Sequence, residues 1–221
     1  MDASRTPPSA PVAHPLDAAG AGPAKRVEDL LLGTLFLLLA APAMLAIALL
    51  VRLDSPGPAL FRQRRYGFHD RLITVHKFRT MRAECADPRG ARQEEHDDSR
   101  VTRLGRFLRR TRLDELPQLF DVLRGDMSLV GPRPYPAGMR VDHGSVHAML
   151  ARCARRYAVK PGITGWAQVN GLSGPVATEE ALRRRVACDL YYIDHWSVAL
   201  DLRILWRTAV MTVRALLGRG P

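Results

Sequence analysis

The chain has 221 residues, a formal net charge of +11, 47% hydrophobic residues and 25% charged residues. This length suits one domain with a buried core, and the composition excludes a collagen, a low-complexity chain and a miniprotein built on disulfides. Arginine supplies almost all of the positive charge. Because a guanidinium matches phosphate oxygens with two hydrogen bonds, we expect a phosphate-bearing partner: nucleic acid, anionic lipid or a nucleotide. The three cysteines form no C-x-x-C pair and are expected to be reduced thiols that pack as small apolar residues.

The N-terminal part of the chain divides into a polar tail and an apolar run. Residues 1–24 are rich in Pro, Ala and Ser and are expected to form a disordered tail. The apolar run extends from Leu30 to Val51 without a charged residue. As a helix it would reach about 33 Å, which is enough to cross the hydrocarbon core of a bilayer. One interpretation of this run is therefore a transmembrane span.

Two features of the same segment favour a helix that enters and leaves one leaflet. Pro42 lies in the middle of the run, where it removes a backbone donor and bends the helix. Basic residues flank both ends, and positive charge favours the cytoplasmic side of a membrane. A re-entrant helix–break–helix over residues 25–52 satisfies both features. From these residues alone, the spanning and the re-entrant interpretations both remain open.

The rest of the chain shows short strands followed mainly by helical periodicity. Residues 59–63 and 72–76 predict a small β-hairpin, and the acidic stretch 83–100 predicts a solvated loop. Apolar spacing predicts helices around residues 104–108 and 116–123, and further helices over the ranges 137–156, 178–195 and 201–217. The fold class is therefore α+β and predominantly helical. The last helix is amphipathic and carries Trp206 with flanking arginines, which suits either the lipid interface or packing against the core.

An Asp–Glu pair is the first motif that could carry chemistry. Pro117 is tolerated only in the first turn of a helix, so a helix is predicted to begin near Asp114 and Glu115. In the plain interpretation, Asp114 caps this helix and Glu115 favours its dipole. In the functional interpretation, two acids lie beside several arginines. An ionised carboxylate can attack phosphorus, and a second carboxylate can hold Mg²⁺ against substrate phosphates.

Other motifs are weaker when each is taken alone. In Gly-Pro-Arg-Pro, two prolines restrain the backbone around Arg133, which suits either anion binding or a turn whose arginine is merely solvated. Lys77 and Arg79 follow a strand and face either phosphate or lipid headgroups, or else solvent. His143 and His147 have the i, i+4 spacing of metal ligands, but a third ligand is missing and a metal role is not favoured. The sequence has no motif of a P-loop kinase, an NAD enzyme or a serine hydrolase.

Four segments in a fixed order carry a resemblance to a known family. They read KFRTM at 77–81, LDELPQL at 113–119, GDMSLVGPRP at 125–134 and KPGITGWAQVNG at 160–171. Together they resemble the bacterial sugar transferases, the monotopic phosphoglycosyl transferases, over about residues 25–217. Because the chain lacks the additional membrane helices and the accessory domain of larger members, it resembles the minimal catalytic form of that family.

The resemblance implies a reaction. A sugar-1-phosphate moves from a UDP-sugar to polyprenyl (undecaprenyl) phosphate, giving polyprenyl-diphosphate-sugar and UMP in the first membrane step of glycan assembly. Asp114 would be the nucleophile and form a covalent phosphosugar intermediate, and Glu115 would help to hold Mg²⁺. Arg109 and Arg133 would contact phosphate. The acceptor is already an anion, so its attack needs no general base, in agreement with a motif of acids and arginines that contains no histidine.

The resemblance also implies where the chain acts. Residues 25–52 would form the re-entrant membrane helix, broken at Pro42, and residues 53–221 the catalytic domain with its C-terminal amphipathic helix. The expected location is the cytoplasmic face of the bacterial inner membrane, in contact with lipid. The transferred sugar, the glycan pathway and the oligomeric state, including a homodimer, stay open.

Two residues depart from the family pattern. Ala41 precedes Pro42 where serine is common, and Arg112 stands where small residues are common, beside the acids. Two other functions compete with the transferase. A non-catalytic membrane scaffold would not need both acids, and a nucleic-acid binder would not need the long uncharged run and lacks a recognisable binding motif. We therefore expect no nucleic-acid partner.

Overall fold

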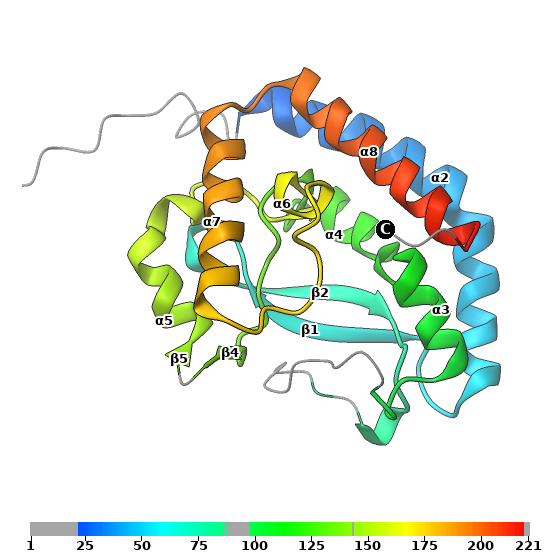
Figure 1. The fold of residues 1–221 in the computed structure, drawn as a ribbon. Coiled ribbons are helices and arrows are strands. Elements are labelled where there is room, and N and C mark those ends of the chain that lie inside the picture. Colours follow the sequence, from blue (N-terminus) through cyan, green and yellow to red (C-terminus); the bar gives the residue numbers. More distant parts are fainter. Residues whose placement is uncertain (1–21, 86, 88–97, 143, 219–221) are drawn as a thin grey trace, which may run out of the picture.

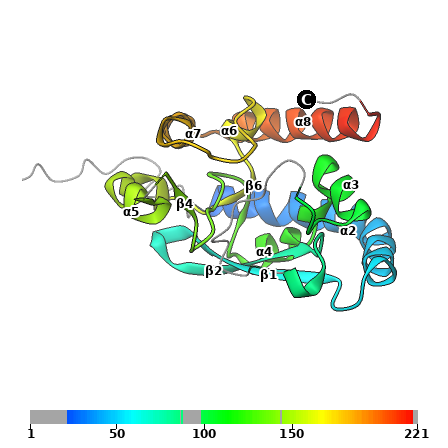
Figure 2. The same cartoon turned by 60° about the horizontal axis from the view of Figure 1, so that its bottom comes forward.

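The computed structural model describes residues 22–85, 87, 98–142 and 144–218. The predicted tail lies almost entirely outside these residues, as do most of the predicted acidic loop and His143. Within the described part of the chain the fold is predominantly helical with three two-stranded sheets, which confirms the predicted α+β class. Figure 2 shows the β1–β2 hairpin on one side of the molecule and α7 and α8 on the opposite side, with α4 and β6 between them.

The apolar run forms α2 (Pro23–Asp54), a helix of 32 residues that is long and apolar enough to cross a membrane. Only 17% of its most apolar window is buried, unlike the core helix of a soluble protein. The helix is continuous through Pro42, and Figures 1 and 2 show its axis turning between the N-terminal and C-terminal halves. The re-entrant placement of this helix in a bilayer stays a prediction.

A buried polar network ties the first turns of α2 to the rest of the fold. Lys25 Nζ lies 2.6 Å from Asp201 Oδ2 at the start of α8 (Val198–Leu216). Asp29 Oδ1 accepts hydrogen bonds from the Ser128 hydroxyl and the Leu129 N–H, each at 2.9 Å. These charges are buried but paired, so their burial is tolerated. The network therefore fixes the position of the first turns of α2 relative to α8 and to residues 128–129.

The predicted hairpin is confirmed. Strand β1 (Leu60–Tyr66) pairs with β2 (Leu72–Phe78) in antiparallel register, across the turn η1 (Phe68–Asp70). After the short turn η2 (Ala83–Cys85), the two predicted central helices appear as α3 (Arg103–Thr111) and α4 (Gln118–Arg124), separated by the 3₁₀ turn η3 (Leu113–Glu115). A parallel pair, β3 (Ser128–Val130) and β6 (Gly162–Thr164), then joins segments far apart in the sequence.

The predicted helix over 137–156 is wrong. This range forms a small hairpin of β4 (Arg140–Val141) and β5 (Gly144–Ser145), then α5 (Val146–Leu150) and the 3₁₀ segment η4 (Ala151–Tyr157). Asp142 adopts the left-handed region at φ 50°, and the glycines at 138 and 144 weaken a helix there. The apolar residues of this range come from several short elements that all pack on one hydrophobic cluster, rather than from one face of a single helix.

The two C-terminal helices agree with prediction. After the short α6 (Trp166–Val169), α7 (Glu179–Asp194) begins at the N-cap Thr178, whose hydroxyl accepts from the Ala181 N–H. Helix α8 begins at the N-cap Ser197, slightly before the predicted start. Its large apolar side chains divide between the core and the surface. Ile204 is fully buried, whereas the exposed ones are Val198, Leu202, Trp206, Val213 and Leu216, followed by Leu217 at the C-cap.

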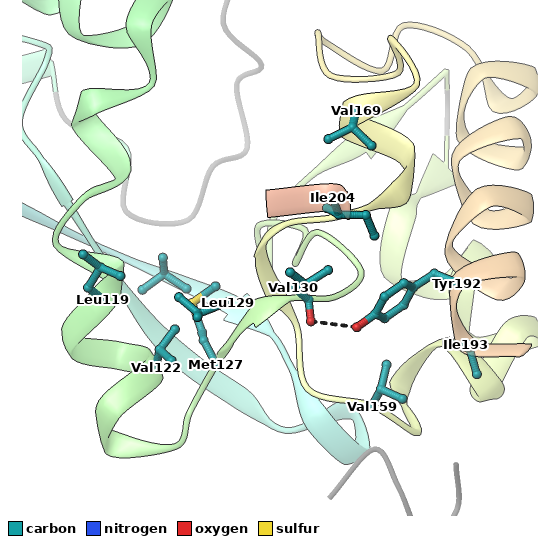
Figure 3. Close-up of a cluster of buried hydrophobic side chains, with 11 residues drawn as sticks. Leu119, Val122, Met127, Leu129, Val130, Val159, Val169, Tyr192, Ile193 and Ile204 are labelled. Atoms are coloured by element: carbon teal, nitrogen blue, oxygen red, sulfur yellow. Dashed lines mark hydrogen bonds between the residues drawn. The ribbon is translucent and has the colours of Figure 1, made fainter. Parts of the chain in front are cut away.

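The main hydrophobic core lies between the hairpin and α8. Figure 3 shows side chains from α4, β3, α7 and α8 converging there, with the Tyr192 hydroxyl donating to the Val130 carbonyl at 3.1 Å. A separate cluster packs the second half of α2, through Met44, Ile47 and Val51, against Phe78 and Leu108. Phe78 follows Lys77, and Leu108 precedes Arg109. Helix α2 is therefore packed directly against the two elements that carry candidate site residues.

Candidate active site

The acid pair lies in the 3₁₀ turn between α3 and α4, and both of its side chains are buried. Helix α4 has Pro117 at its N-cap position, and no side chain caps it. The capping interpretation of Asp114 is therefore wrong. Asp114 and Glu115 lie in the turn between the end of α3 and the start of α4. Capping of α4 therefore does not explain why both side chains are buried.

Glu115 is held by two cations from separate parts of the chain. Lys77 Nζ donates to Oε1 at 2.9 Å, Arg133 Nη2 donates to Oε1 at 2.6 Å, and Arg133 Nη1 donates to Oε2 at 3.2 Å. Burial disfavours the charged form of Glu115, but Arg133 and Lys77 outweigh it and hold the pKa well below its ordinary value. Glu115 is therefore an ionised, oriented carboxylate.

Asp114 has the opposite environment. Its carboxylate makes no hydrogen bond to any residue in the described part of the chain. Burial raises the pKa of Asp114 to about 6, with Lys77 opposing the shift and the neighbouring Glu115 charge adding to it. Near neutral pH Asp114 is mostly ionised. Unlike Glu115, it is not held by a hydrogen bond from a described residue, although it lies beside several cations. This is the arrangement expected of a carboxylate nucleophile rather than of a structural ion pair.

Arg109 belongs to the same region. Its Nε donates to the Thr80 hydroxyl at 2.7 Å, and its charge lowers the pKa of Asp114. The approach of α3 to this segment requires a glycine, because a Cβ at Gly105 would lie 2.1 Å from the Thr80 carbonyl oxygen. Close packing of backbone on backbone thus sets the position of Arg109.

The structure places two other predicted site residues apart from the acids. Arg79 donates to the backbone carbonyls of Val51, Ser55 and Pro56, so its guanidinium closes the C-terminal end of α2. Pro42 lies on an exposed part of α2. A phosphate contact by Arg79 stays a prediction. The structure brings together Asp114, Glu115, Lys77 and Arg133, with Arg109 near enough to act on Asp114.

One supporting pair was missed from the sequence. Arg156 donates to the backbone carbonyl of Arg133, and its Nε lies 2.7 Å from Asp189 Oδ2. Its guanidinium also lies over the Tyr135 ring, 4.7 Å from the centroid. Both charges are almost fully buried. An arginine in a basic stretch and an aspartate on an amphipathic helix resemble ordinary surface residues, so no local pattern identified them.

Side chains in the described part of the chain offer few ligands for a metal ion. Among the described residues no group of three or more His, Cys, Asp and Glu side chains could hold a metal ion. His147 instead places Nε2 3.0 Å from the Asp70 carboxylate, which accepts the hydrogen bond, and stacks on Tyr66. The three cysteines are free thiols, as predicted, but are half-buried rather than fully buried.

Comparison with known proteins identifies the family. The family model for bacterial sugar transferase matches residues 21–215. The undecaprenyl-phosphate glucose phosphotransferase of Komagataeibacter xylinus is 49% identical over 184 residues, which are 83% of this chain and 35% of that protein. The UDP-glucose:undecaprenyl-phosphate glucose-1-phosphate transferase of Escherichia coli K12 is 49% identical over 185 residues, 83% of this chain and 39% of that protein.

A shorter relative matches almost end to end. The exopolysaccharide production protein PSS of Rhizobium leguminosarum bv. phaseoli is 45% identical over 186 residues, 84% of this chain and 93% of that protein. The chain thus spans little more than a third of the first two relatives but nearly the whole of the third. With a family model covering most of its length, this chain belongs to the bacterial sugar transferases.

Proposed function

We propose that this protein transfers a sugar-1-phosphate from a UDP-sugar to undecaprenyl phosphate. The observation that carries the proposal is the contrast within the acid pair. Glu115 is fixed by Lys77 and Arg133, whereas Asp114 is buried, makes no hydrogen bond to a described residue and has a pKa raised by burial to about 6. In a bacterial sugar transferase, this arrangement offers a carboxylate nucleophile and positively charged side chains around the phosphate.

The reaction proceeds in two displacements at one phosphorus atom. An Asp114 oxygen attacks the phosphorus that bears the sugar, the bond from that phosphorus to the UMP phosphate oxygen breaks, and UMP leaves with the electron pair. An oxygen of undecaprenyl phosphate then attacks the same phosphorus, and the bond to Asp114 breaks to restore the carboxylate. No proton has to be removed, because both attacking oxygens are anionic. Lys77, Arg133 and Arg109 supply positive charge around the transferred phosphoryl group.

The donor set fits a single Mg²⁺. The two oxygens of Glu115 accept three hydrogen bonds, and a carboxylate has about four acceptor positions, so one position is left. Mg²⁺ is commonly held by one or two carboxylates together with substrate phosphates and water. Glu115 would thus hold the ion from one side. When bound, the ion would neutralise charge on the donor diphosphate.

The membrane contacts follow from the exposed apolar surface. Helix α2 exposes most of its leucines, and Trp206 on α8 and Leu217 at its C-cap are 71% and 66% exposed. Such surfaces need an apolar partner, and an interfacial helix with flanking arginines suits the headgroup boundary. In the proposed arrangement α2 is re-entrant and the catalytic part lies at the cytoplasmic face of the inner membrane, where undecaprenyl phosphate presents its headgroup.

Glucose is the sugar to test first. Relatives that are 46–49% identical are named as UDP-glucose:undecaprenyl-phosphate glucose-1-phosphate transferases, whereas an N-acetylgalactosamine-phosphotransferase of Aeromonas hydrophila is 41% identical. Purified protein in detergent or lipid nanodiscs would be incubated with undecaprenyl phosphate and a panel of UDP-sugars, and UMP release would be measured. UDP-glucose is expected to give the highest rate.

The decisive variant is Asp114→Asn. It should abolish UMP release, and mass spectrometry of wild-type protein with donor alone should show the phosphosugar on Asp114. Asp126→Asn serves as a matched control, since Asp126 is a half-exposed aspartate nearby in the sequence, and it should keep full activity. No UMP release with any UDP-sugar would favour the scaffold function, and an adduct on another side chain would overturn the mechanism.

A further inference from the structure

Arg112 occupies a backbone position that does not suit an arginine. It closes α3 in the left-handed region, at φ 60° and ψ 14°, and its N–H donates to the Arg109 carbonyl at 3.1 Å. Glycine is the residue that normally takes this position at a helix end, because a Cβ makes the conformation unfavourable. The backbone therefore gives no reason for an arginine here, and a reason has to come from the side chain.

The side chain of Arg112 is unpaired within the part of the chain that the structure describes. Arg112 is half-buried, yet its guanidinium makes no hydrogen bond or ion pair with any residue that the structure describes. The other cations at the acid pair are engaged: Lys77 and Arg133 bind Glu115, and Arg109 binds Thr80. A partly desolvated guanidinium without a partner is costly, which indicates that its partner is a ligand.

The electrostatic surroundings place Arg112 at the same site. Burial lowers the pKa of Arg112, its repulsion from Arg133 adds to this, and its attraction to Glu115 and Asp114 opposes it. Arg112 therefore lies close enough to interact electrostatically with Asp114, the proposed nucleophile, and with Arg133. An anion held against Asp114 would lie within the same group of charges.

The two displacements differ in their leaving groups, and therefore in their need for an additional cation. In the first, the leaving group is the nucleotide phosphate, which gains negative charge as the bond to phosphorus breaks. In the second, the leaving group is the Asp114 carboxylate, a weak base that leaves without assistance. A free guanidinium is most useful against the leaving phosphate of the first displacement.

We propose that Arg112 binds the diphosphate of the donor and stabilises the charge that develops on the leaving UMP. This inference rests on the proposed function. It assigns a third arginine to the site, beside Arg109 and Arg133.

The test compares Arg112→Gly, Arg112→Lys and wild type, with Arg110→Ser as control, because Arg110 is an exposed arginine on the same helix. Adduct formation from UDP-glucose alone isolates the first displacement. Arg112→Gly should slow it by about 10- to 100-fold, the loss expected for charge-assisted hydrogen bonds, and should weaken binding of UMP by about 10-fold in calorimetry. Arg112→Lys should recover part of both, whereas kcat/KM for undecaprenyl phosphate should not change, because this ratio reports only the second displacement.

Stability separates this role from a structural one. Glycine relieves the left-handed strain, so Arg112→Gly should keep or raise the melting temperature while binding UMP less tightly. Unchanged UMP binding and adduct formation in Arg112→Gly, a change confined to the acceptor step, or an equal loss in Arg110→Ser would each overturn the inference. These results differ from failure of the proposed function, in which wild-type protein itself would form no adduct and bind no UMP.

Discussion

The guanidinium of Arg156 donates a hydrogen bond to the backbone carbonyl of Arg133, the arginine that binds Glu115. Asp189 on α7 holds Arg156 from the other side at 2.7 Å. A buried chain of contacts therefore runs from α7 through Arg156 and Arg133 to the acid pair. In this way a helix that contributes no residue to the site contributes to its geometry.

Asp189→Asn should affect both stability and the position of Arg133. Removing one partner of a buried ion pair leaves the other charge uncompensated, and a loss of about 3–5 kcal/mol in the free energy of unfolding is expected. Denaturant unfolding measures this, and a lowered kcat in the folded fraction would report the disturbed Arg133. Glu180→Gln removes an exposed ion pair on the same helix and should cost less than about 0.5 kcal/mol. Equal effects of the two variants would contradict the proposed contact chain.

Glu115→Gln should be nearly inactive even in its folded fraction, and it should also be less stable, because two cations lose their counter-charge. The amide cannot compensate the charges of Lys77 and Arg133, and a loss of about 10²- to 10³-fold in UMP release is expected. If Glu115 also holds Mg²⁺, chelation by EDTA should inhibit wild-type protein, and added Mg²⁺ should restore the rate. In Glu115→Gln the residual rate should depend less on Mg²⁺. Equal wild-type rates with Mg²⁺ and with EDTA would refute the metal role.

The first displacement should depend on pH through Asp114. Burial raises the pKa of this carboxyl to about 6, above its ordinary 3.8. Attack requires the ionised form, so the rate of adduct formation should be full above about pH 7 and fall to half near pH 6. The measurement uses donor alone, because undecaprenyl phosphate carries its own ionisation near this pH. A rate that stays level down to pH 5 would show that Asp114 titrates lower or is not the nucleophile.

The membrane topology of α2 can be tested at its two ends. Val27 and Leu53 are exposed on either side of the apolar run, at 53% and 74%. With the native cysteines replaced, cysteines introduced at 27 and at 53 should both react with an impermeant maleimide in inverted vesicles and not in intact spheroplasts. Labelling of the two ends from opposite sides would show a spanning helix. Pro42→Ala should shift the pattern towards spanning, because it removes the cause of the bend.

Much of the fold could be predicted because its signals are local. The hairpin, α3, α4, α7 and α8 follow from alternation, helical periodicity and capping residues within each segment. The same local reading failed over residues 137–156, where the apolar positions belong to several short elements that pack on one cluster. Periodicity records that a side chain is buried, but not whether one helix or three short pieces bury it.

The sequence by itself determined the apolar segment with its proline, the adjacent Asp114 and Glu115, and the order of motifs typical of the family. The tertiary structure alone decided that the two acids differ. Glu115 meets Lys77 and Arg133 from positions 38 and 18 residues away, whereas the Asp114 carboxylate meets no hydrogen-bonding partner among the described residues. Neighbouring carboxyls are equivalent in an extended chain. Only the packing of distant segments removes water from both and brings hydrogen-bonding cations to one of them, and this sets which of the two acids is held in place.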